Sequence, residues 1–485
     1  MLLLSSLGLM AMSTAVAQKT TKTAAGKNFG YNIEVNFAEK VTDDYVYLAH
    51  YFGKGLPRVY RTDSAKVIDG NKAVFQSKDS ILGGIYMVMY NKNAAFNQLL
   101  LDNGYKFKMN INKDGVTDFV GNDENELFEK HEKFVANMGK KRQVFIDKMK
   151  DAKTHADSTA IQKELQKLGD EDREFRNNFV KEQPKALLST FFRAMQTPEV
   201  PEGTHYLADG KTVDSNFAYN YYKAHYWDNF DFTDNRLIHS PIYDARLDEY
   251  FNRLILPVPD TVNAEGDALL AKTRGAKELF KYTLHWLAGW TSDAKVMGLD
   301  ESFVHFVEKY YMKGDAYWLD SKGLADYEKR ARAIAPTVLG NKGKDLKLQD
   351  AMTLVERPLY SVKSKYTLLV FWAYDCGHCM EEIPKLAKLY NDSLKAKGVT
   401  VYTVGTKGNL TDVQKVVKEH FPKDWITGVD TKGTENYSES YDVLGTPRLY
   451  LLDEDKIIVG KQLSHETLMS VLDYVEKKKN KVVKN

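Results

Sequence analysis

The 485-residue chain contains only two cysteines, Cys376 and Cys379, which stand three positions apart. This scarcity excludes a fold held together by disulfides, because a bridge between them closes a short loop and removes little entropy from the unfolded chain. A zinc site built on this pair needs two further ligands, and the eleven histidines are scattered along the sequence. We therefore predict a protein without a metal site and without structural disulfides.

The sequence also lacks an excess of charge of either sign. Lys and Arg number 68 against 66 for Asp and Glu, so a polyanionic partner such as a nucleic acid is not expected. The sequence has no glycine-rich nucleotide-binding loop and no basic stripe of the kind that binds nucleic acids. We predict no nucleic-acid partner and no cofactor.

Long apolar runs are missing as well, except at the start of the chain. Residues from Leu2 to Val16 are apolar or small, but this run of about fifteen residues is short for a transmembrane helix, which needs about twenty. Ala15-Val16-Ala17 fits the small-x-small pattern that precedes signal-peptide cleavage. We predict that residues 1–17 are a signal peptide cut near Ala17–Gln18, and that the protein is exported to the periplasm or cell envelope.

The predicted signal peptide departs from the usual pattern at its first residues. Leu2 follows Met1 directly, where basic residues are expected, so whether the start is complete stays open. The alternative is that the segment forms a buried strand or helix of the mature fold. No cysteine lies near residue 18, so we do not expect a lipid-anchored terminus.

The length of the chain predicts about three domains, and the first of them has the pattern of β-strands. Apolar residues alternate with polar ones in two runs, Tyr31, Ile33, Val35, Phe37 and Tyr105, Phe107, Met109, Ile111. Asp69-Gly70 and Asn103-Gly104 are typical of tight hairpin turns. We predict an antiparallel β-sandwich over residues 28–120, with a small barrel as the alternative.

The remainder divides into a helical and an α/β part. Residues 121–335 have a helical pattern in a charged background, and Leu127, His131, Phe134 and Met138 recur at helical spacing at its start. Residues 336–485 alternate strand and helix and end in a hairpin and a closing helix, which predicts a layered α/β domain. The expected fold class is therefore multidomain α+β, with a sandwich, a central helical domain and a C-terminal α/β domain.

The two cysteines lie where a strand is expected to pass into a helix. Cys376-Gly377-His378-Cys379 follows the apolar run from Tyr366 to Trp372. At a helix start, unpaired backbone N–H groups and the helix dipole favour a thiolate, so Cys376 has the position of an attacking sulfur. Cys379, one turn on and more buried, is placed to resolve the mixed disulfide that Cys376 forms.

Two neighbours of Cys376 are expected to affect its thiol in opposite directions. His378 stabilises the thiolate when it is protonated, which favours the reduced form of the pair. Asp375 places a carboxylate beside the thiolate and opposes this effect, because like charges raise the pKa of the thiol. A disulfide between Cys376 and Cys379 closes too short a loop to stabilise the fold of an exported protein, so we predict that it is functional.

These residues resemble thioredoxin. The shared features are Phe371-Trp372-Ala373, the Cys-Gly-His-Cys motif, Pro384 within the following helix, and Thr446-Pro447 before the closing hairpin. The Glu381-Glu382-Ile383-Pro384 continuation and the long segment before Pro447 resemble the TlpA/ResA-type thiol-disulfide oxidoreductases of bacterial envelopes. The resemblance covers about residues 336 to 485. More weakly, the upstream chain resembles the β-rich and helical accessory region of some envelope thioredoxin-like proteins.

The resemblance implies a role for each matched residue. Cys376 is the nucleophile and Cys379 the resolving thiol; Glu382 is the acid near the sulfurs; Pro447, after Thr446, is a cis-proline that positions the backbone of the substrate. Val370 occupies the place of a buried aspartate in thioredoxin, which leaves Glu382 as the candidate for proton transfer. The family further implies protein thiol or disulfide substrates, a membrane-borne electron donor and, for some members, cytochrome c maturation.

Three functional hypotheses follow. The first is an exported reductase of protein disulfides. The second is an isomerase or oxidase, because Gly-His between the cysteines resembles protein disulfide isomerase. The third is an envelope binding protein in which residues 28–335 hold a glycan, peptide or protein partner and the redox centre is a sensor. The aromatic patch from His225 to Asn229 is a candidate pocket in the upstream region, although such a patch more often reflects core packing.

Overall fold

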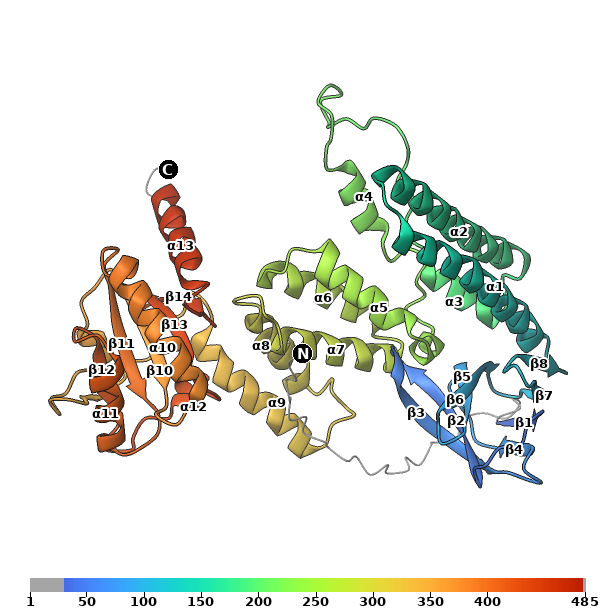
Figure 1. The fold of residues 1–485 in the computed structure, drawn as a ribbon, viewed down its shortest axis with the longest axis horizontal. Coiled ribbons are helices and arrows are strands. Elements are labelled where there is room, and N and C mark those ends of the chain that lie inside the picture. Colours follow the sequence, from blue (N-terminus) through green and yellow to red (C-terminus); the bar gives the residue numbers. More distant parts are fainter. Residues whose placement is uncertain (1–29, 483–485) are drawn as a thin grey trace. The chain divides into compact units, whose positions relative to one another are not determined.

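The computed structural model describes residues 30–482 (Figure 1). The predicted signal peptide, residues 1–17, lies outside them. The described residues group into two compact units, 30–49 with 61–154 and 50–60 with 155–482. The domain boundaries expected from the sequence stay predictions, whereas the order of sheets, helices and α/β domain is the predicted one.

The N-terminal strands form two four-stranded sheets, with strand orders β4-β1-β7-β8 and β3-β2-β5-β6. Alternation produces the core here, since Ile33 and Val35 of β1 are fully buried while Glu34 between them is half-buried. The strands are β1 (Tyr31–Phe37), β2 (Tyr45–Phe52), β3 (Lys54–Lys66), β4 (Lys72–Ser77), β5 (Gly84–Tyr90), β6 (Ala95–Leu101), β7 (Lys106–Ile111) and β8 (Thr117–Val120).

Two details of these sheets differ from the expected antiparallel hairpins. Asp69-Gly70 and Asn103-Gly104 do form turns, with positive φ at Asp69, Gly70 and Gly104. However, each turn carries the chain from one sheet to the other, because β3 and β4 belong to different sheets and so do β6 and β7. In addition, β1 pairs with β7 in a parallel ladder. Local turn chemistry sets the turn, whereas strand pairing is decided by distant segments.

The helix α1 (Asp123–Asp151) follows the strands, and its N-cap is Asn122, whose side chain accepts a hydrogen bond from the Asn125 N–H. Asn125 is fully buried, and its side-chain amide exchanges two hydrogen bonds with the backbone of Leu100 in β6, at 2.8 Å each. The start of α1 is therefore fixed to the sheet by a satisfied buried polar group.

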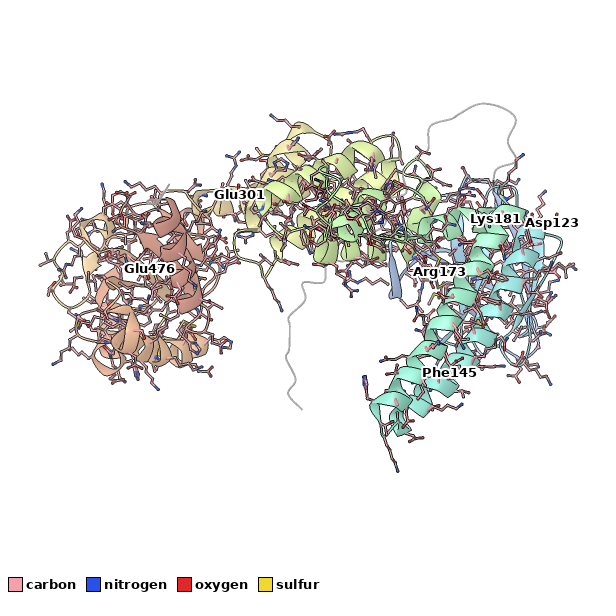
Figure 2. All side chains as sticks on the ribbon, turned by 90° about the horizontal axis from the view of Figure 1, so that it is seen from above. Asp123, Phe145, Arg173, Lys181, Glu301 and Glu476 are labelled. Carbon is pink, nitrogen blue, oxygen red and sulfur yellow. A yellow bond between two sulfur atoms is a disulfide. The ribbon has the colours of Figure 1, made fainter. Side chains whose placement is uncertain are left out.

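The second unit contains most of the predicted helical region. Its helices are α2 (His155–Glu182), α3 (Leu187–Met195), α4 (Phe217–His225), α5 (Ile242–Glu249), α6 (Pro259–Thr273), α7 (Lys277–Ser292), α8 (Asp300–Lys309) and α9 (Ser321–Ile334). Polar and charged side chains project along the length of α2, where Arg173 and Lys181 are labelled (Figure 2). Within residues 30–482, no helix combines the length and the apolar character that crossing a bilayer requires.

The C-terminal strands of the described chain form a six-stranded mixed sheet in the order β14-β13-β10-β11-β12-β9. β10 runs parallel to β11 and antiparallel to β13, so it is flanked on both sides. The elements are β9 (Gln349–Asp350), β10 (Tyr366–Trp372), α10 (Gly377–Leu389), β11 (Val399–Gly405), α11 (Leu410–His420), β12 (Ile426–Val429), α12 (Tyr437–Ser440), β13 (Arg448–Asp453), β14 (Ile458–Lys461) and α13 (Leu468–Val482).

Both faces of this sheet are covered. All seven residues of β10 are buried, and alternate residues face opposite sides. Leu368, Val370 and Trp372 pack with residues of α10, α11 and α13, while Leu369 and Phe371 pack with Tyr441 and with apolar residues between 346 and 362. A strand buried on both faces reads as a continuous apolar run, which is the pattern seen in the sequence.

Candidate redox centre

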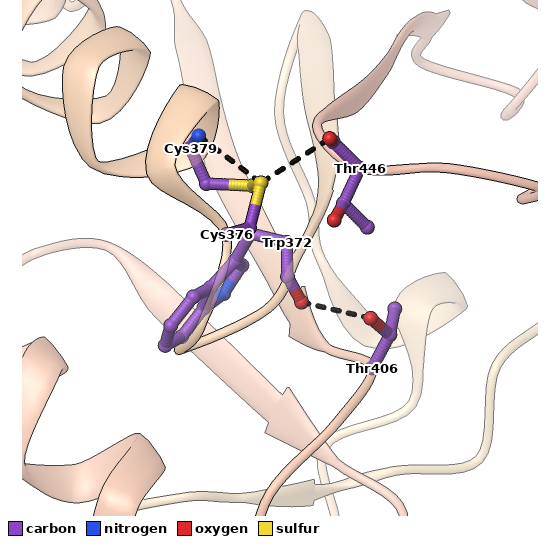
Figure 3. The surroundings of a disulfide bond; sticks show 5 residues. All are labelled: Trp372, Cys376, Cys379, Thr406 and Thr446. Carbon is purple, nitrogen blue, oxygen red and sulfur yellow. Dashed lines mark hydrogen bonds between the residues drawn. A yellow bond between two sulfur atoms is a disulfide. The ribbon is translucent and has the colours of Figure 1, made fainter. Parts of the chain in front are cut away.

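The two cysteines lie at the junction of β10 and α10 (Figure 3). Cys376 is the N-cap residue of α10, with φ −94° and ψ 106°, and its Sγ accepts a hydrogen bond from the Cys379 N–H at 3.2 Å. The two sulfurs are joined in a disulfide. The predicted position of Cys376 at the start of a helix is therefore confirmed, and the helix supplies a backbone donor to its sulfur.

The two sulfurs differ in their exposure. Cys379 is fully buried in the core that α10 forms with β10, whereas Cys376 is half-buried at the edge of the same core. A substrate sulfur can therefore approach Cys376 more readily than Cys379. This difference fits an attacking first cysteine and a resolving second one.

A loop before β13 closes over Cys376. The Thr446–Pro447 peptide bond is cis, as the family resemblance implies. The carbonyl oxygen of Thr446 lies 3.2 Å from Cys376 Sγ, so this loop and the helix start meet at one sulfur (Figure 3). Arg448 follows Pro447 and opens β13, opposite Phe371 of β10. Strand pairing thus brings residues that are distant in the sequence to the redox centre.

The segment that enters the motif is also held by hydrogen bonds. The Trp372 carbonyl accepts a hydrogen bond from the Thr406 N–H at 2.8 Å. It also accepts one from the Thr406 hydroxyl at 3.0 Å, which Figure 3 shows. The Trp372 ring is fully buried and makes an edge contact with Phe421 at 5.0 Å between centroids. These contacts fix the end of β10, from which the cysteine motif begins.

Glu382 lies on α10 and is largely buried, with 15% of its side chain exposed. Its Oε1 accepts a hydrogen bond from the His465 N–H at 2.5 Å, and its Oε2 lies 2.8 Å from His465 Nδ1. His465 was not among the predicted site residues, and no short-range signal indicates it, because it lies beyond β14 in the sequence. The carboxylate is thus held in one orientation, and its predicted role in proton transfer stays a prediction.

The remaining predicted residues lie around the same junction. Asp375 and His378 are exposed on either side of Cys376 in the sequence, at the tip where α10 begins. Val370 is fully buried inside β10. The structure therefore brings Cys376, Cys379 and Thr446-Pro447 together, with His378 at the surface beside them.

The predicted patch from His225 to Asn229 divides into two parts. Tyr226 and Trp227 are buried and pack against each other edge to face at 4.9 Å between centroids, which is core packing. His225, Asp228 and Asn229 instead line an open cleft of about 770 Å³. The other lining residues come from α2, such as Arg173, Arg176 and Lys181, from the segment Met195 to Glu199, and from Tyr221 of α4.

Comparison with known families gives two matches along the chain. Residues 339–475 match the Redoxin family, and residues 177–335 match a domain of unknown function, DUF5106. The first match includes Cys376, Cys379, Glu382 and Pro447. The second spans the end of α2 through α9.

Among curated proteins, the chain is similar to thiol-disulfide oxidoreductase ResA of Bacillus cereus, with 28% identity over 136 residues, 28% of this chain and 70% of the relative. ResA of Bacillus thuringiensis is 26% identical over the same shares. Among solved structures, a thioredoxin-like protein from Bacteroides caccae is 22% identical, with a TM-score of 0.46 over 57% of this chain and 97% of that chain. A domain of a possible thiol-disulfide isomerase from Cytophaga hutchinsonii is 34% identical, with a TM-score of 0.28; the match covers 30% of this chain and 99% of that chain.

Proposed function

We propose that this chain, a thioredoxin-like thiol-disulfide oxidoreductase of the TlpA/ResA type, reduces disulfides in exported proteins. In this proposal the Cys376–Cys379 pair carries the two electrons. The observation that supports it most directly is the position of Cys376 Sγ, at the N-cap of α10 and 3.2 Å from the Cys379 N–H.

The proposed reaction has two exchange steps. The Cys376 thiolate attacks one sulfur of the substrate disulfide, a mixed disulfide forms, and the other substrate sulfur leaves as a thiolate that takes up a proton. The Cys379 thiol then loses its proton and attacks Cys376 Sγ. The Cys376–Cys379 disulfide forms, and the second substrate sulfur leaves and is protonated. The substrate is reduced by two electrons and the enzyme is oxidised by two.

Several residues are assigned supporting roles. The N-terminal end of α10 stabilises the Cys376 thiolate through its backbone donors and dipole. Glu382, oriented by His465, accepts the proton of Cys379 in the second step. His378 favours the thiolate when protonated, and the cis Thr446–Pro447 segment positions the substrate backbone beside Cys376.

Location and partners complete the proposal. Export by the segment 1–17 places the protein in the periplasm or cell envelope, where an oxidised pair needs a reductant to be recycled. A membrane-borne dithiol donor supplies those electrons by the same exchange chemistry. Apocytochrome c cysteines are the client proposed from the resemblance to envelope oxidoreductases.

Turnover of a protein disulfide tests the enzymatic claim. The full chain, pre-reduced and recycled with dithiothreitol, is expected to accelerate insulin reduction, and Cys376→Ser is expected to remove the acceleration. Met380→Leu, which changes a half-buried apolar residue next to the motif and keeps both cysteines, is the matched control. Equal turnover by the wild type and Cys376→Ser rejects the proposal. The reduction potential of the pair, measured against glutathione, separates a reductase from an oxidase or isomerase.

The cleft beside α2 favours a second candidate, a binding protein whose redox centre is a sensor. The cleft presents the cations Arg173, Arg176 and Lys181 together with the carboxylates of Asp170 and Asp228, a mixture suited to a polypeptide segment. Cys379→Ala in the full chain tests this alternative. Mixed disulfides recovered with substrates support the enzyme. Partners retained equally by the Cys376→Ser/Cys379→Ser variant, and lost on Arg176→Glu, support the binding protein.

A further inference from the structure

The loop that touches Cys376 is anchored at both ends by one buried carboxylate. Asp442 is 2% exposed and adopts a positive φ of 50°. It lies four residues before Thr446, and its Oδ2 accepts a hydrogen bond from Arg448 Nη2 at 2.7 Å. Arg448 directly follows Pro447. The residues before and after the cis peptide are thus joined by a charge-assisted hydrogen bond.

The second cation at Asp442 comes from outside the thioredoxin-like domain. Arg330 of α9 donates from Nη1 to Asp442 Oδ1 and from Nη2 to Oδ2, the latter at 3.3 Å. α9 falls within the segment that matches the domain of unknown function, whereas Asp442 and Arg448 fall within the Redoxin match. Arg330 therefore connects the helical region to the loop at the redox centre.

We propose that Arg330 is a positioning residue for the redox reaction, which holds the loop from Asp442 to Arg448 so that the Thr446 carbonyl stays against Cys376 Sγ. The two-pronged guanidinium contact fixes the orientation of the Asp442 carboxylate as well as its charge. Because Asp442 is so close to Thr446 along the chain, a change in its orientation is passed directly to the carbonyl.

A second contact supports the rigidity that this role requires. Lys461 of β14 is fully buried and its Nζ lies 2.7 Å from Asp300 Oδ2 of α8 and 3.0 Å from the Thr337 hydroxyl. β14 pairs with β13, the strand that Arg448 opens. The helical region is thus bound to two adjacent points of the sheet, and α9 is a fixed support for the loop.

The position of the Thr446 carbonyl has a chemical consequence for the reduced enzyme. A carbonyl oxygen at hydrogen-bond distance accepts from the S–H group and repels the thiolate, so it favours the neutral thiol. If the loop loosens, the carbonyl withdraws and the thiolate becomes easier to form. If Arg330 acted only through its charge at a distance, its loss would raise the pKa of the Cys376 thiol, because a cation favours the thiolate. The direction of the effect therefore separates positioning from long-range electrostatics.

The experiment measures the alkylation rate of Cys376 by iodoacetamide across pH, in the reduced full chain carrying Cys379→Ala so that one thiol reacts. Arg330→Lys keeps the positive charge but loses the two-pronged contact with Asp442. Any change in the alkylation profile of Cys376 therefore reports a change in the position of the loop. We expect it to lower the apparent pKa of Cys376 by about half a unit, which makes alkylation about threefold faster at pH values below the pKa. Arg332→Ala, an exposed neighbour on α9, is the control and is expected to match the unsubstituted protein.

Two outcomes overturn the inference, namely an Arg330→Lys profile equal to that of the Arg332→Ala control, and a shift of the apparent pKa upward. Thermal unfolding of each variant establishes that the folded protein was measured. The experiment uses Arg330→Lys because this conservative change is less disruptive to folding than Arg330→Ala. The inference rests on the proposed function for its catalytic meaning, but its test needs no turnover. Insulin reduction that depends on Cys376, together with an unchanged alkylation profile, rejects the positioning role and leaves the proposed function standing. A shifted alkylation profile without Cys376-dependent turnover supports the positioning role and rejects the proposed function.

Discussion

Two sulfurs three residues apart have different surroundings because the helix turns between them. Cys376 caps α10 and faces the Thr446 carbonyl, while Cys379 points into the core and is fully buried. The motif alone predicts this division, since one helical turn separates the two residues and only the first lies at the helix start. The partner of Glu382 was not predictable in the same way, because His465 comes from a distant loop.

The first prediction at this scale concerns Glu382. Glu382→Gln keeps the size and the acceptor for the His465 N–H but cannot take up the Cys379 proton. We expect resolution of the mixed disulfide to slow about a hundredfold at neutral pH, a typical contribution of general base catalysis. Rapid-quench measurement of substrate release gives the rate. Glu381→Gln, at the exposed neighbouring position, is the control, and equal rates for the two variants would remove Glu382 from the mechanism.

The second prediction concerns Asp375 and His378, the two exposed residues beside Cys376. Asp375→Asn removes a carboxylate that repels the thiolate, so the pKa of Cys376 is expected to fall. His378→Gln removes a group that stabilises the thiolate when protonated, so the pKa of Cys376 is expected to rise. The ultraviolet absorbance of the thiolate across pH measures both. Shifts of the same sign in the two variants would contradict this electrostatic account.

At the scale of secondary structure, burial decides how well the sequence predicts an element. The predicted strand from Tyr366 to Trp372 is identical to β10, because seven consecutive buried residues leave an unambiguous apolar run. The amphipathic pattern from Met380 to Leu394 predicts that the following helix spans these residues. The regular α-helix ends at Leu389, and residues Tyr390–Leu394 form one π-helical turn. The sequence pattern does not indicate β9 and β12, because strands of two and four residues carry little periodicity.

The amphipathic character of α10 gives a prediction for stability. Leu386 is fully buried against the sheet, while the adjacent Lys385 is exposed. Leu386→Ala is expected to lower the free energy of unfolding by about 2–5 kcal/mol through lost burial and a cavity. Lys385→Ala is expected to change it by less than about 0.5 kcal/mol. Urea denaturation followed by tryptophan fluorescence measures both, and similar values for the two would contradict the observed orientation of the helix.

At the scale of the whole molecule, the sequence predicts the order of sheets, helices and α/β domain but not the contacts that join distant segments. Charged residues such as Arg330, Asp442 and Lys461 are ordinarily exposed, and their sequence neighbourhoods give no sign of burial. Asp442 and Lys461 are buried and Arg330 is half-buried, because each meets a partner of opposite charge from another part of the chain. For the same reason, the turns at Asp69-Gly70 and Asn103-Gly104 were correct locally while the strands they join pair elsewhere.

The buried Lys461–Asp300 pair supports the prediction at this scale. Lys461→Met leaves Asp300 as an uncompensated buried charge, and we expect it to lower the free energy of unfolding by about 3–5 kcal/mol. Lys461→Met combined with Asp300→Leu removes both charges and is expected to cost less than Lys461→Met alone. Urea denaturation of the two variants and of Asp300→Leu completes the cycle. Additive effects would show that the two side chains do not interact in the folded protein.

The parallel pairing of β1 with β7 has a consequence for biosynthesis. Ile33 and Val35 lie in the first described strand to leave the ribosome, yet they need Phe107 and Met109 beside them, and those residues are translated much later. Until β7 is made, one edge of β1 has unpaired backbone groups and its apolar side chains are incompletely covered. Such unpaired strands associate with other chains. A holdase chaperone that shields the first strand during synthesis should therefore raise the yield of this protein more than one that acts after the chain is released.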